Sequence, residues 1–144
     1  MCLTVKMFQK PLIAEKDITV YKVVENLKVI DLLFFKIITA RTIYRRSKIR
    51  LGKTYKSELE YYTNIFKRNG TVEEGLHSFV NLKDCYYIVP NICSYNITDS
   101  QTTYFAFYFI IECIIPKGSE YYVGVFDTIP SIASSKLKYV RIVE

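Results

Sequence analysis

The sequence is short of the residues on which metal and cofactor sites usually depend, with one histidine, four cysteines and five glycines in 144 residues. Zinc normally needs three or four well-spaced cysteine, histidine or carboxylate ligands, and one histidine among scattered cysteines does not supply them. The glycines also lie too far apart for a phosphate-binding or dinucleotide-binding loop. We therefore expect neither a metal nor a cofactor.

Long apolar runs are missing as well. Residues 1–11 lack the continuous apolar segment and the small-residue cleavage site of a secretory signal. The longest apolar run, residues 104–115, is too short to span a membrane and contains Glu112. The four cysteines form no C-x-x-C pair and lie in largely apolar surroundings, which is typical of reduced, buried thiols. A Cys85–Cys93 disulfide is the alternative. These features predict an intracellular, cytoplasmic protein with no membrane partner.

Acidic residues are absent from residues 36–56, a stretch that holds eight basic residues and that we call the basic segment. The whole chain has 20 basic and 14 acidic residues, so the rest of the chain is mildly acidic. A charge asymmetry of this kind favours an anionic partner. That partner is either a nucleic acid or an acidic protein surface.

Strand periodicity divides the basic segment into two faces. An extended chain places alternate residues on opposite sides, so the even-numbered residues from Tyr44 to Arg50 share one side. Arg41 and Arg45 fall on the other side, where either could pair with Glu112. Arginine binds phosphates through paired hydrogen bonds, and tyrosine stacks on exposed bases. The predicted anion-binding residues are Tyr44, Arg45, Arg46, Lys48, Arg50, Lys53 and Lys56.

Length and pattern predict one globular domain over residues 1–144 with an α+β fold, built mostly of antiparallel sheet with two short helices. Residues 29–40 and 104–115 are rich in β-branched and aromatic side chains, which predicts strands buried in the sheet. Exposed sheet edges and 13 tyrosines also suit contacts with a second copy or an assembly partner.

Two segments carry signals for helix ends. Ser57 and Glu60 fit a capping box, which predicts a helix over residues 58–68 that ends before Gly70. Asn81 and Pro90 are expected to bound a second helix over residues 81–89.

An enzymatic alternative rests on His77, Glu112 and Tyr21. The side chain of His77 is the only one in the sequence whose unperturbed pKa lies near neutrality. Glu112 interrupts an apolar strand, where a carboxylate is either paired with a cation or raised in pKa. The three residues could line a cleft that binds a nucleotide. The structural alternative is a hydrogen-bonded histidine and an ion-paired glutamate.

Two segments also carry a resemblance to known proteins: Gly75-Leu76-His77-Ser78-Phe79 with Leu82-Lys83-Asp84-Cys85 after it, and Ile114 to Gly124. Through them the chain resembles small uncharacterised proteins of gut Bacteroidetes and their phages. This resemblance implies a phage-encoded protein, with the virion as one setting. The segment from Gly75 is similar to part of ADP-ribosyltransferase-like folds, although Tyr21 and Lys22 stand where such enzymes place arginine or histidine. The leading hypothesis is a small non-enzymatic protein that binds an anion through the basic segment.

Overall fold

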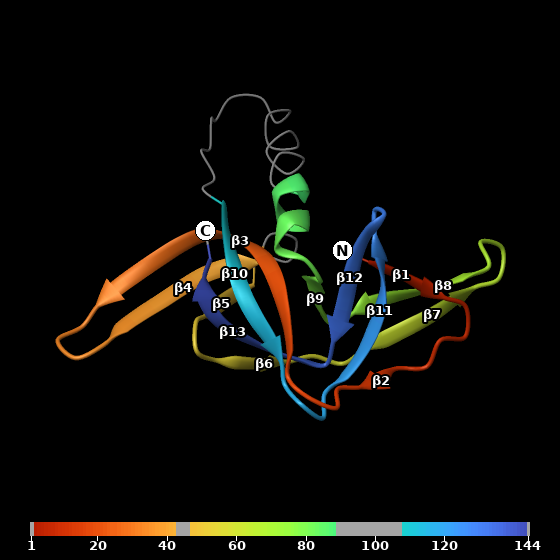
Figure 1. Cartoon of the computed structure of the whole chain (residues 1–144), viewed down its shortest axis with the longest axis horizontal. Coiled ribbons are helices and arrows are strands. Elements are labelled where there is room, and N and C mark those ends of the chain that lie inside the picture. The colour runs from red at the N-terminus through yellow and green to blue at the C-terminus, as the bar shows by residue number, and fades with distance from the viewer. Residues whose placement is uncertain (1, 43–46, 89–107, 144) are drawn as a thin grey trace.

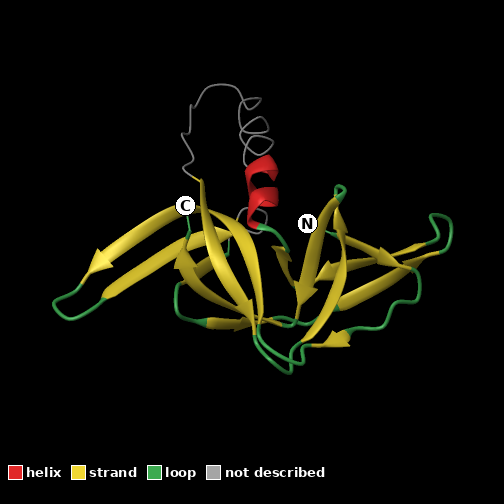
Figure 2. Cartoon of the chain, viewed as in Figure 1, coloured by secondary structure: helices red, strands yellow, loops and turns green. Residues whose placement is uncertain are grey.

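Strands dominate the computed structural model, which describes residues 2–42, 47–88 and 108–143. This part of the chain contains one helix, residues 82–88, beside the strands (Figures 1 and 2). The strands in the described ranges are β1 (Leu3–Lys6), β2 (Leu12–Ile13), β3 (Ile18–Asp31), β4 (Lys36–Thr42), β5 (Lys48–Arg50), β6 (Thr54–Lys56), β7 (Glu60–Asn64), β8 (Asn69–Glu74), β9 (Leu76–Phe79), β10 (Tyr108–Ile115), β11 (Glu120–Phe126), β12 (Ile129–Ser134) and β13 (Lys136–Ile142).

All of these strands belong to one antiparallel sheet, which follows the order β6-β13-β10-β3-β9-β12-β11-β1-β8-β7. β4 pairs with β3 and β5, and β2 pairs with β11. The turn after β5 comes back to β13, because the Gly52 amide donates to the Tyr139 carbonyl at 2.7 Å and the Tyr139 amide donates to the Lys53 carbonyl at 3.3 Å. The sheet therefore curls, and one of its faces encloses the main core.

That core follows from the alternation of apolar residues along β3 and β10. Val20 and Val24 of β3 and Ile111 and Cys113 of β10 share the inner face and are buried. The predicted strand over residues 104–115 is confirmed from Tyr108 onward, and residues 104–107 lie outside the described part. Two smaller clusters, one around Val72 and Tyr122 and one around Phe79 and Ile110, cover other parts of the sheet.

The prediction of an α+β fold with two short helices is wrong. Residues 58–68 form the β7–β8 hairpin in place of a helix, whereas the second predicted helix is present over residues 82–88. The reason lies in Tyr61, whose ring stacks on Tyr122 with centroids 5.6 Å apart and an interplanar angle of 14°. The same ring lies against Gly70, where a side chain would collide with it. This packing requires an extended backbone and overrides the local capping signal.

The prediction of one buried strand over residues 29–40 is also wrong. β3 ends at Asp31 and β4 begins at Lys36, and the turn between them is closed by a hydrogen bond from the Leu32 amide to the Phe35 carbonyl at 2.9 Å. This β3–β4 hairpin and the β7–β8 hairpin project at opposite ends of the molecule (Figure 1). Leu33 and Phe34, at the tip of the β3–β4 hairpin, are 94% and 93% exposed. An apolar tip that projects into solvent is typical of a contact surface.

The described cysteines are free thiols. Cys85 and Cys113 are buried, and burial raises the pKa of each thiol to about 12, whereas Cys2 is exposed. Cys93 lies outside the described residues, and Cys85 is not in a disulfide.

No helix within residues 2–42, 47–88 and 108–143 is long and apolar enough to cross a membrane.

Candidate anion-binding site

Part of the basic segment lies on the outer face of a ribbon made by the second half of β3, β4 and β5. Directly opposite residues of an antiparallel pair share a face of the sheet. Ala40 lies opposite Ile49, and both are buried in the core, so their neighbours along the strands point outward. The outward cations are Arg41, which lies opposite Lys48, together with Arg50 and Lys28, which both lie opposite Thr39.

We call Lys28, Arg41, Lys48 and Arg50 the cationic face. All four side chains are exposed. None of them forms an ion pair with an acid among the residues that the structure describes, and this includes Glu25, which lies opposite Arg41. A groove of about 530 Å³ runs beside the face and is lined by Lys28, Arg41 and Lys48 as well as Leu27, Thr39, Ala40 and Phe109. The cationic face is therefore a surface whose charge is not neutralised from within the described chain.

The structure places the other predicted anion-binding residues as follows. Lys53 lies in the turn before β6, with its ammonium 5.6 Å from the centroid of the Tyr55 ring. Lys56 is exposed on β6, opposite Lys136. Tyr44, Arg45 and Arg46 lie outside the described residues.

Two members of the cationic face were not assigned to it from the sequence. The sequence predicts Arg41 on the other face of the sheet from Lys48, because it treats the basic segment as one continuous strand. The chain reverses between β4 and β5, so Arg41 and Lys48 become neighbours on the same side. Lys28 comes from β3, twenty residues before Lys48, and no local spacing could connect it with the basic segment. The register of the hairpin is the signal that unites these residues.

Glu112 pairs with a cation, although not with one from the basic segment. Arg141 on the adjacent strand β13 donates from Nε to Glu112 Oε1 at 3.1 Å and from Nη2 to Oε2 at 3.0 Å. These hydrogen bonds, more than the charge of Arg141 itself, hold the pKa of the Glu112 carboxyl below its ordinary value, while desolvation opposes the shift. Glu112 is thus an ionised partner of Arg141, and such a carboxylate is poorly suited to donate a proton near neutrality.

Replacing Glu112 by Gln should make a small change in stability that depends on pH. Because folding lowers the pKa of Glu112, its stabilising effect is present above the unfolded pKa of about 4.3 and is lost as pH falls through the lower, folded value. Arg141 is largely exposed, so we expect Glu112→Gln to cost less than about 1 kcal/mol at pH 7 and a smaller amount at pH 2. Urea unfolding at the two pH values measures this difference. An equal cost at both would contradict an ionic role.

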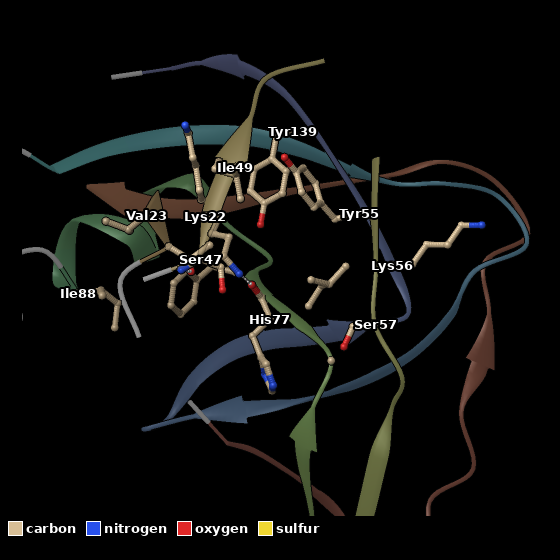
Figure 3. A pocket seen from close by; sticks show the side chains of 15 residues that line it. Lys22, Val23, Ser47, Ile49, Tyr55, Lys56, Ser57, His77, Ile88 and Tyr139 are labelled. Carbon is tan, nitrogen blue, oxygen red and sulfur yellow. Dashed lines mark hydrogen bonds between the residues drawn. The ribbon is translucent and has the colours of Figure 1, made fainter. Parts of the chain in front are cut away.

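A cavity of about 280 Å³ lies where β3, β5, β6, β9 and β13 approach one another. His77 contributes to its lining, and the His77 carbonyl accepts a hydrogen bond from Lys22 Nζ (Figure 3). The His77 ring points away from Tyr55 and Tyr139 in the same view. Tyr21 and Glu112 lie opposite each other across β3 and β10 and are not among the lining residues. The structure therefore does not bring His77, Glu112 and Tyr21 together in this cavity.

No known protein family, curated protein or solved structure matches this chain.

Proposed function

We propose that this protein is a non-catalytic nucleic-acid-binding protein whose cationic face contacts the phosphate backbone. The observation that carries the proposal is the grouping of Lys28, Arg41, Lys48 and Arg50 on one exposed side of a ribbon, without an acidic partner among the described residues. Phosphates supply the opposite charge, and their interaction with lysine and arginine provides most of the affinity of sequence-independent binding. A phage or virion setting stays a prediction of the resemblance.

The arrangement of the charges favours a phosphate chain over an acidic protein surface. Lys48 and Arg50 are two residues apart on an extended strand, about 7 Å, and Arg41 lies beside Lys48 on the next strand. A regular polyanion can follow such a row, whereas a folded protein would need acids at matching positions. The two guanidinium groups can each form paired hydrogen bonds to a phosphate. The groove beside the face offers the Thr39 side chain as a further polar contact.

Removing three of the four charges should remove most of the binding. We expect Lys28→Gln, Arg41→Gln and Arg50→Gln together to weaken binding at low salt by tens-fold or more, because each phosphate contact contributes about −0.7 to the slope of log affinity against log salt for single strands. The unaltered protein, with about four contacts, should lose roughly 50-fold in affinity between about 50 and 200 mM salt, and the variant far less. Fluorescence anisotropy with labelled DNA and RNA strands measures both quantities.

A matched triple variant controls for net charge. Lys16→Gln, Lys67→Gln and Lys117→Gln remove three exposed lysines from other parts of the structure and should change affinity by less than about threefold, since these lysines do not contact the bound phosphates. Equal weakening in both triples would mean that only the net charge matters. Binding of polyglutamate as tightly as of nucleic acid would favour an acidic protein partner, and no binding at low salt would remove the proposal.

A further inference from the structure

The 280 Å³ cavity shares only Lys48 with the cationic face and has the character of a small-molecule site. Its lining is largely apolar, with side chains contributed by Ile49, Tyr55, Leu76, Phe79 and Ile88. In Figure 3, Ile49 and Tyr55 lie on either side of the ring of Tyr139, and Ile88 lies further away. Ligand sites of this kind combine apolar walls with a few polar groups that fix the orientation of the ligand.

One such polar group is the hydroxyl of Tyr139. Tyr139 is only 1% exposed, and its hydroxyl points into the cavity (Figure 3). The ring of Tyr139 packs edge-to-face against the ring of Tyr55. The Tyr139 hydroxyl forms no hydrogen bond with any residue that the structure describes. Burial raises the pKa of Tyr139 well above its ordinary value, so the group stays protonated and can donate. The hydroxyl is therefore available inside the cavity as a hydrogen-bond donor for a ligand.

The charge of the lining shows what kind of acceptor fits. Lys22 points to the inner side of the sheet, on the face that it shares with Val20 and Val24, and its ammonium reaches the cavity wall at the His77 carbonyl. Lys48 and Lys56 are the other charged lining residues, and the described lining includes no aspartate or glutamate. An ammonium at an apolar wall attracts anions more strongly than an exposed one, because less water screens it.

We infer that this cavity binds a small organic anion. The phosphate or carboxylate group of the ligand contacts Lys22 and the Tyr139 hydroxyl. Its flat apolar part packs against Tyr55, Leu76 and Phe79. The volume of about 280 Å³ is just below the usual range for ligand pockets, so the ligand is no larger than a mononucleotide. A mononucleotide and an aromatic carboxylate share this chemistry. The inference goes beyond the proposed function, because only Lys48 of the four cationic-face residues also lines this cavity.

The experiment uses four probes with the full chain: uridine monophosphate, uridine, inorganic phosphate and benzoate. Isothermal titration calorimetry should detect binding of uridine monophosphate or benzoate, and at least tenfold weaker binding of uridine and of inorganic phosphate, because each of these lacks one half of the recognised chemistry. Tighter binding of uridine monophosphate than of benzoate identifies the acidic group as a phosphate, and the reverse order identifies a carboxylate. If neither of the two binds, the inference is overturned.

Two variants locate the binding in the cavity. Tyr139→Phe deletes only the hydroxyl and should weaken the binding anion about tenfold while leaving the urea midpoint of the unliganded protein unchanged, since no described residue bonds to that hydroxyl. Lys22→Met keeps the length of the side chain and should weaken binding by more than tenfold. If Lys22→Met fails to fold because the bond to His77 is lost, Tyr139→Phe still decides the matter.

Lys138→Met is the matched control, because Lys138 is exposed on β13 and is not part of the lining. It should leave the affinity of the anion unchanged. Unchanged affinity in Tyr139→Phe, or equal weakening in Lys138→Met, would overturn the inference. Lys48 lines both the cavity and the groove, so it is altered in neither set of variants. A loss of anion binding in the cavity therefore remains distinguishable from a loss of nucleic-acid binding at the cationic face.

Discussion

Replacing Gly124 by Ala should destabilise the protein by about 3 kcal/mol or more, although the change adds a single methyl group. Gly124 lies in β11 opposite Ser131 of β12, where β11 also pairs with β1. A Cβ atom at this position would fall on the backbone carbonyl of Thr4 and would lie 2.8 Å from Val5 Cγ1. A backbone carbonyl held in a sheet cannot move aside as a flexible side chain can, so β1 would have to separate from β11.

The sign of this effect tests the close approach of the two strands. Intrinsic conformational preference alone would make alanine in a strand more stable than glycine by about 0.5–1 kcal/mol. Urea unfolding followed by circular dichroism and tyrosine fluorescence measures the difference, since the chain has no tryptophan. Val123→Ala on the same strand is the control and should cost under about 1 kcal/mol, because Val123 is substantially exposed. A Gly124→Ala protein as stable as the original would contradict the packing of β1 on β11.

The failure to predict the β7–β8 hairpin shows the limit of local signals. Ser57 and Glu60 have the spacing of a capping box, and Gly70 has the position of a helix stop. In the structure Gly70 serves a different purpose, because its missing side chain leaves room for the ring of Tyr61. Tyr61 in turn stacks on Tyr122 of β11, which lies 61 residues further along the sequence. No local pattern contains that contact.

The β3–β4 hairpin shows a second limit. The β-branched residues on both sides of the turn correctly indicate extended chain, but the four residues from Leu32 to Phe35 include neither glycine nor proline and so give no turn signal. Their apolar character suggested burial, whereas all four are exposed. Folded proteins expose many apolar atoms, so an apolar run by itself does not establish a core position.

The candidate site was predictable in composition and not in geometry. The eight cations and the absent acids of residues 36–56 are evident in the sequence, and the alternation around Ile49 correctly sends Lys48 and Arg50 to the outside. The pairing of Arg41 with Lys48 depends on the chain reversal between β4 and β5. The place of Lys28 on the same face depends on the pairing of β3 with β4. The cavity depends on the return of the chain from β5 to β13, which brings Tyr55 and Tyr139 together. Long-range pairing is the information that local periodicity lacks.

Replacing Ile111 by Ala should cost about 2–5 kcal/mol of unfolding free energy. Ile111 is 0% exposed in the main core, directly opposite Lys22 across the β3–β10 pair. Its truncation removes buried apolar surface and leaves a cavity that the curled sheet can only partly close. Ile114→Ala lies on the other face of the same strand, where the side chain is only partly buried, and it should cost about 1 kcal/mol. Urea unfolding of both variants measures the difference, and equal costs would contradict the assignment of the inner face.

Ile111→Ala also separates stability from binding. The cationic face lies on the outer side of the β3–β5 ribbon, so each folded molecule should bind nucleic acid with its original affinity, whereas the triple variant of Lys28, Arg41 and Arg50 should keep its stability and lose affinity. Anisotropy titrations well below the unfolding midpoint make this comparison. If Ile111→Ala lost affinity as strongly as the triple variant at full folding, the phosphate contacts would have to depend on the interior of the sheet, and the outer cations could not by themselves be the binding site.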